Sequence, residues 1–119
     1  MNNIIKALLT LSLTLGLLAS CTQPKHPPMD MTVAVQNAKS KADQEALAAH
    51  YEQAAKDAEA KVEEHKKILS QYEREPWLFG KQATGFGLHC KKLIQIYSQE
   101  VEENLEMAKM HRQLAGEAQ

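Results

Sequence analysis

Residues 47–75 of the chain read LAAHYEQAAKDAEAKVEEHKKILSQYERE, and this stretch decides the fold. Its apolar and aromatic side chains recur in alternating steps of three and four, which is the period of one helix face, while lysine and glutamate fill the other faces. The repeating positions are Leu47, Tyr51, Ala54/Ala55, Ala58, Val62, His65, Leu69 and Tyr72. Glu75 precedes Pro76, and a residue before proline avoids the helical conformation, so we expect this helix to end there.

The same period returns after a glycine-containing stretch, and it predicts a second helix. The repeating positions there are Cys90, Ile94, Tyr97, Val101, Asn104, Ala108, His111 and Ala115. We expect helices over about 40–75 and 86–117, with a loop over 76–86, which gives two nearly matched rods of about 50 Å. Ser40 and Asp43 resemble a capping pair at the first helix start. The predicted fold class is therefore all-α, a long antiparallel two-helix hairpin of coiled-coil type within a domain at 40–119.

Tyrosine and histidine occupy matching positions on the two predicted helices. Each helix carries a Tyr followed two heptads later by a His, at Tyr51 and His65 and at Tyr97 and His111. Folding the chain back at the centre of the predicted loop places Tyr51 opposite His111 and His65 opposite Tyr97. The loop position rests on proline and glycine alone, so this agreement is an independent indication of the hairpin.

These histidines have two interpretations. In the first, each imidazole shares a hydrogen bond with the phenol opposite, since buried polar groups are nearly always paired and a polar pair can fix the register of a coiled coil. In the second, His50, His111 and Met107 meet as a metal site, because imidazole and thioether donors suit copper. Methionine at helical spacing is, however, commonly a packing residue.

The loop and the first turns of the second helix also leave alternatives open. Trp77, Leu78 and Phe79 either cap the end of the hairpin or form an exposed docking tip for another protein. Cys90 is expected either to be a buried free thiol that faces Tyr72, or to be reactive because a helix amino terminus lowers the pKa of a thiol.

The amino-terminal segment has the features of an export signal. Lys6 precedes a twelve-residue apolar stretch, Ala7 to Leu18, which is too short for a membrane-spanning helix of ~20 residues. It ends in Leu18-Ala19-Ser20-Cys21, which resembles the lipobox of bacterial lipoproteins. The resemblance implies removal of a signal peptide, residues 1–20, and acylation of Cys21 with several chains, which anchor a protein stably. The alternative is an ordinary secretory signal followed by an unmodified cysteine.

The remaining sequence limits the partners. Prolines at 24, 27 and 28 predict an extended segment from Thr22 to about Met31, within a flexible tether at 21–39 between the lipidated cysteine and the helical domain. The alternative to a helix start at Ser40 is an earlier start near Thr32. The chain has 14 basic and 15 acidic residues, and removal of Lys6 with the signal leaves 13 against 15, so nothing indicates nucleic-acid binding. Apolar side chains outside the predicted seam predict a homodimer that forms a four-helix bundle. They are Leu88, Ile96, Leu105 and Leu114.

Together these observations predict a non-enzymatic, lipid-anchored structural or interaction protein of the bacterial cell envelope. The resemblance to lipoproteins, with Thr22 rather than aspartate after the cysteine, implies the periplasmic face of the outer membrane. The alternative function is a periplasmic copper-handling lipoprotein. The sequence holds no zinc-type cysteine pair, no phosphate-binding loop and no spaced Ser/His/Asp set, and these absences underlie the expectation that the chain is not an enzyme.

Overall fold

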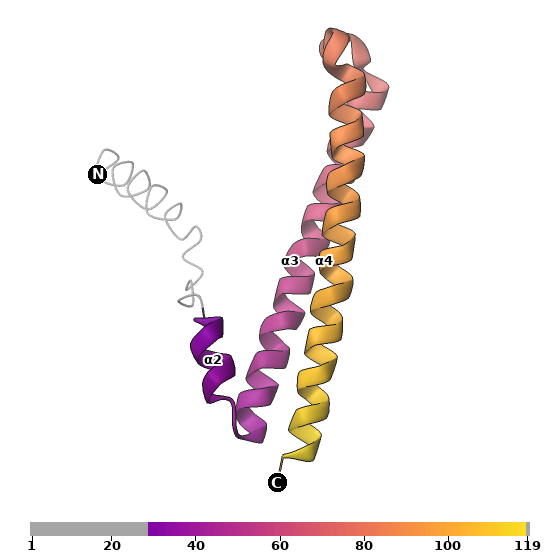
Figure 1. Ribbon diagram of the computed structural model, residues 1–119. Coiled ribbons are helices and arrows are strands. Elements are labelled where there is room, and N and C mark those ends of the chain that lie inside the picture. Colours follow the sequence, from indigo (N-terminus) through magenta and orange to yellow (C-terminus); the bar gives the residue numbers. More distant parts are fainter. Residues whose placement is uncertain (1–28, 119) are drawn as a thin grey trace, which may run out of the picture. The chain divides into compact units, whose positions relative to one another are not determined.

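The computed structural model describes residues 29–118, and within them the chain is a hairpin of two long helices (Figure 1). Helix α3 spans Lys41–Arg74 and helix α4 spans Ala83–Glu117, and the two pack side by side in opposite directions. Two short 3-10 helices connect them, η1 at Pro76–Leu78 and η2 at Gly80–Gln82. The predicted all-α hairpin is confirmed. The signal segment 1–20 and Cys21 lie outside the described residues.

Helix α3 begins at a complete capping box. The Ser40 hydroxyl accepts a hydrogen bond from the Asp43 backbone N–H at 3.1 Å, and the Asp43 carboxylate accepts one from the Ser40 backbone N–H at 2.9 Å. The Ser40 backbone and side-chain hydrogen bonds, and a weaker one from Lys39, lower the pKa of Asp43. The predicted capping pair at Ser40 and Asp43 is confirmed, and it satisfies two of the free N–H groups at the start of the helix.

A short helix, α2, precedes this cap at Met31–Asn37, where the tether was predicted to continue. Residues 31–37 of the predicted tether are therefore helical, which agrees with the alternative helix start near Thr32, although Ala38 to Ser40 separate α2 from α3. Proline disfavours a helix only up to Pro28, and the sequence MTVAVQN that follows contains neither proline nor glycine. The side-chain amide of Gln44 donates to the carbonyl of Ala38 at 3.4 Å, which ties the end of this segment to α3.

The connection between the helices is shorter than the predicted loop. Helix α3 ends at the expected place, with Glu75 as its carboxyl cap, but α4 begins at Ala83 rather than near 86. Gly80 alone adopts a left-handed backbone, with φ of 55°. Gly85 and Gly87 lie inside α4, where a glycine costs only ~1 kcal/mol relative to alanine and packing can offset that cost.

The core between α3 and α4 consists mainly of alanine. Five of the eight buried apolar residues are alanines, and the full set is Leu47, Ala48, Ala55, Ala58, Val62, Cys90, Ala108 and Ala115. Small side chains at a helix contact allow the two axes to approach closely. Larger side chains of the seam therefore lie toward the edges of the contact and remain partly exposed.

The exposed apolar side chains expected on α4 are confirmed, but they do not share one face. Leu88, Ile96, Leu105 and Leu114 keep 63%, 44%, 50% and 47% of their surface exposed. By helical geometry, Ile96 and Leu114 lie on one side of the seam, Leu105 lies on the other, and Leu88 lies near the loop. Among the described helices, none is long and apolar enough to cross a membrane.

Two glycine substitutions should shift the stability of the hairpin in opposite directions. An added Cβ at Gly85 would meet its nearest atom, the Oε1 of Gln82, only at 4.0 Å, so Gly85→Ala should raise the free energy of unfolding by about 0.5–1 kcal/mol. Gly80→Ala should lower it by about 1–2 kcal/mol, because its φ of 55° is left-handed. Urea unfolding of the Thr22–Gln119 fragment at one protein concentration measures both. Equal shifts would contradict the positions assigned to these glycines.

Candidate functional site: the hairpin tip and the Tyr/His layers

The tip of the hairpin divides the three apolar loop residues between two roles. Phe79 turns inward, with its ring centroid 4.6 Å from that of Tyr72 and 6.3 Å from that of Phe86, both edge-on. Trp77 and Leu78, in η1, keep 70% and 64% of their surface exposed. Phe79 therefore caps the end of the hairpin, as the first interpretation expected. Trp77 and Leu78 have the exposure that the second interpretation, a docking tip, requires.

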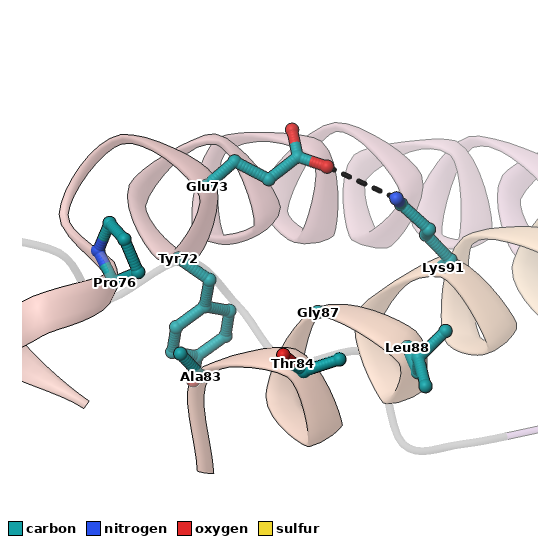
Figure 2. A pocket seen from close by; sticks show the side chains of 8 residues that line it. All are labelled: Tyr72, Glu73, Pro76, Ala83, Thr84, Gly87, Leu88 and Lys91. Carbon is teal, nitrogen blue, oxygen red and sulfur yellow. Dashed lines mark ion pairs between the residues drawn. The ribbon is translucent and has the colours of Figure 1, made fainter. Parts of the chain in front are cut away.

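A hollow of about 270 Å³ lies beside the tip, between the end of α3 and the start of α4 (Figure 2). Its apolar lining includes Tyr72, Pro76 and Leu88, and the ion pair of Glu73 with Lys91, 3.1 Å from Oε1 to Nζ, closes one side. The volume is below the ~300–1,000 Å³ of typical small-molecule pockets. It is large enough for an apolar side chain of a protein partner.

The sequence did not reveal this hollow as a candidate binding site. In particular, it gave no indication that Leu88 and the ion pair of Glu73 with Lys91 would line one. Leu88 is off the heptad seam, and its exposed position was visible from helical geometry. The hollow itself was not visible, because the loop was expected to extend through residue 86. Since α4 already begins at Ala83, the first helical turns stand opposite Tyr72 and form one wall of the hollow.

The structure brings the predicted Tyr/His pairs together. The ring centroids of Tyr51 and His111 are 5.5 Å apart with an interplanar angle of 10°, and those of His65 and Tyr97 are 5.5 Å apart with an angle of 15°. Both pairs are therefore stacked. We call these two pairs the Tyr/His layers.

The expected hydrogen bond between imidazole and phenol is not what holds these layers. Among the described residues no hydrogen bond joins an imidazole to the phenol of its pair, and the imidazole Nδ1 atoms have other environments. His111 Nδ1 lies 2.8 Å from Oε1 of Gln44, within hydrogen-bonding distance. His65 Nδ1 is buried without a hydrogen-bond partner among the described residues. The ammonium of Lys61 lies 5.1 Å from the centroid of the Tyr97 ring, a cation–π contact in the second layer.

An ion-pair network covers one side of the seam near the open end of the hairpin. Arg112 binds Glu45 through Nη1 and Glu52 through Nη2, both at 2.7 Å. The hydrogen bond and charge of Glu52 raise the pKa of the Arg112 guanidinium. With Glu73 and Lys91, these residues form what we call the ion-pair edge. The paired side chains are 38–59% exposed, so each pair contributes little to stability.

The proposed metal ligands have other contacts. His50 meets the Tyr51 ring edge-on at 5.7 Å, and His111 stacks on Tyr51 while its Nδ1 approaches Gln44. Residues 29–118 contain no group of three or more His, Cys, Asp or Glu side chains arranged to hold a metal ion. A copper site at His50, His111 and Met107 stays a prediction, and its donors would have to include the thioether.

Cys90 is a buried free thiol, with 6% of its surface exposed. Helix α4 begins at Ala83, so Cys90 lies about two turns inside the helix, whereas the effect of a helix terminus is confined to the first turn. The geometry agrees with the interpretation of a packing residue rather than a reactive thiol. Tyr72, the neighbour expected for Cys90, stacks on Phe86, with ring centroids 5.2 Å apart.

With this geometry the described part of the chain belongs to the class of antiparallel helical hairpins. Comparisons with protein-family models, with curated protein sequences and with solved structures find no match to this chain.

Replacing each histidine of the Tyr/His layers with phenylalanine should have opposite effects on stability. His65→Phe keeps a ring against Tyr97 and removes the buried nitrogen without a partner, so the free energy of unfolding should rise by about 1 kcal/mol. His111→Phe removes the contact with Gln44 and should lower it by about 1 kcal/mol. Urea unfolding at pH 7.5 measures both. A loss of stability in His65→Phe would contradict the environment described for that ring.

Proposed function

We propose that this chain is a lipid-anchored helical interaction protein of the bacterial cell envelope, and that it presents the hairpin tip to a protein partner. The observation that carries the proposal is the exposure of Trp77, Leu78 and Leu88, each more than 60% exposed. Leu88 lines the hollow, and Trp77 and Leu78 directly follow its lining residue Pro76 in η1. Tryptophan is enriched at the energetic centres of protein interfaces, and exposed apolar patches mark such sites.

The geometry of the hairpin suits this role. Helix α3 has 34 residues, which at ~1.5 Å per residue places the tip about 50 Å from the start of that helix. A tether ahead of α3 would link the start of the hairpin to the membrane, and the length of α3 would let the tip reach partners about 50 Å from that point. The ring packing of Phe79, Tyr72 and Phe86 supports the base of the tip, so a partner would meet a surface that is already ordered.

The lipid anchor rests on the sequence Leu18-Ala19-Ser20-Cys21 and the short apolar segment before it. Cys21→Ser should abolish incorporation of radiolabelled palmitate and should release the protein from membranes prepared from a bacterial host. Cys90→Ser, in which the other cysteine is changed, should leave both properties intact. Labelling that persists in Cys21→Ser would exclude this anchor.

A photo-crosslinking amino acid at position 77 should capture the partner of the tip. We expect a covalent product with a protein other than a second copy of the chain, and its loss when Leu88→Asp is added, because a carboxylate beside the hollow opposes burial of an apolar side chain. The same crosslinker at Gln99, an exposed position on the outer face of α4, serves as the matched control. Equal products from positions 77 and 99, or none from 77, would contradict a docking role for the tip.

A further inference from the structure

The two sides of the hairpin seam differ sharply in chemistry. One side carries the ion-pair edge. On the other side, the residues four before and three after each ring of the Tyr/His layers lie next to that ring on the helix surface. These eight neighbours are Leu47, Ala54, Lys61, Ile68, Leu93, Glu100, Met107 and Leu114; Leu47 is buried within the hairpin, with 2% of its surface exposed, and supports the face from beneath. We call the surface formed by the four rings and these neighbours the Tyr/His face.

The Tyr/His face is apolar except at its centre. Its only charged members are Lys61 and Glu100, which lie on the two helices between the two Tyr/His layers. Leu114 on the face is 47% exposed. Ile96 and Met110, which directly precede Tyr97 and His111 and extend the face outward, are 44% and 47% exposed. An apolar strip of this length with a single pair of opposite charges is suited to another apolar surface that carries the same pair.

We infer that a second copy of this chain covers the Tyr/His face, and that the two hairpins pack in parallel as a four-helix bundle with both tips at one end. This inference concerns a surface separate from the tip and does not depend on the proposed docking function. It specifies which face associates, which helix meets which, and which charged residues pair.

The charges select the parallel arrangement. When two hairpins pack face to face in parallel, α3 lies over α4 of the second copy. Each residue of α3 then meets the same α4 residue that it faces within its own hairpin. Lys61 meets Glu100 of the partner subunit, and the symmetry repeats the contact, so the central charges are paired twice. In this arrangement Ile68 meets Leu93 of the partner subunit.

The antiparallel arrangement separates these charges. With the Tyr/His layers kept in register, α3 then lies over α3, and Lys61 meets Ala54 of the partner subunit. In the same way, Glu100 meets Met107 of the partner subunit. Both charges would be covered by apolar side chains of the second copy and would have no opposite charge across the interface, which is costly. The apolar contacts are similar in the two arrangements, so the single charged pair decides between them.

Crosslinking between two differently tagged copies of the full chain tests the arrangement. Both copies carry Cys90→Ala; one also carries Ile68→Cys and the other Leu93→Cys, and they are co-expressed and treated with a short bifunctional maleimide. We expect a product that contains both tags, in clear excess over the same pair without the two introduced cysteines, which measures any background from Cys21. A product no stronger than that background would overturn the inference. A product of Leu93→Cys with Leu114→Cys instead would show the antiparallel arrangement, in which α4 lies over α4 of the second copy, and would overturn the inference equally; Leu114 is 47% exposed and open to the reagent.

Charge reversal provides a second measurement that does not depend on cysteine substitutions. Lys61→Glu in both copies, or Glu100→Lys in both, should each reduce association ~tenfold or more, because like charges then meet at the centre of the interface. Combining one Lys61→Glu copy with one Glu100→Lys copy should restore it. Lys67→Glu, the same change on the outward surface of α3, should leave association unchanged. Failure of the mixed pair to recover would overturn the inference, and the crosslink at position 77 would still report separately on the tip.

Discussion

The close contact of α3 and α4 through alanine is the constraint on which the rest of the structure depends. Ala48, Ala55 and Ala58 of α3 and Ala108 and Ala115 of α4 are buried in the core, and such small side chains allow the helices to approach closely and leave little space between them for a large ring. The tyrosines and histidines of the seam must therefore lie flat against one another at one side. Their stacking, the partial exposure of the Tyr/His face and the separation of the ion-pair edge on the opposite side all follow from this contact.

Most of the fold could be predicted because its signals are local and periodic. The three-and-four spacing located both helices, Pro76 located the end of α3, and Ser40 with Asp43 located its start. The pairing of Tyr51 with His111 also followed from counting, because an antiparallel hairpin has only one register once its loop is placed. Each of these features depends either on a few neighbouring residues or on the single register of two regular helices, and both can be read from the sequence.

The features that the sequence did not reveal depend on side-chain packing. In the Tyr/His layers the rings stack and make no hydrogen bond to one another, and this ring geometry depends on how the neighbouring core residues pack, which no sequence pattern states directly. Gly85 and Gly87 suggested a loop, yet both are helical, since the local cost of glycine is smaller than the gain from extending α4 along α3. The hollow at the tip is a consequence of that same extension.

The small size of the alanine residues also limits what one hairpin can stabilise by itself. Apolar burial contributes roughly 25 cal/mol per Å², and an alanine offers little area, so a core built mainly of alanine gives a modest total. The larger apolar side chains, among them Leu114, Met110 and Ile96, lie outside that core and would be buried only against another surface. Association through the Tyr/His face would then couple folding to assembly.

A parallel pair would also place two tips side by side. A partner with two binding sites would then engage the second tip at a high effective concentration, without any new contact. The alanine contact thus has two effects. It limits the apolar area that one hairpin buries, and it leaves larger side chains exposed, which can join two hairpins and so bring two tips into one bivalent surface.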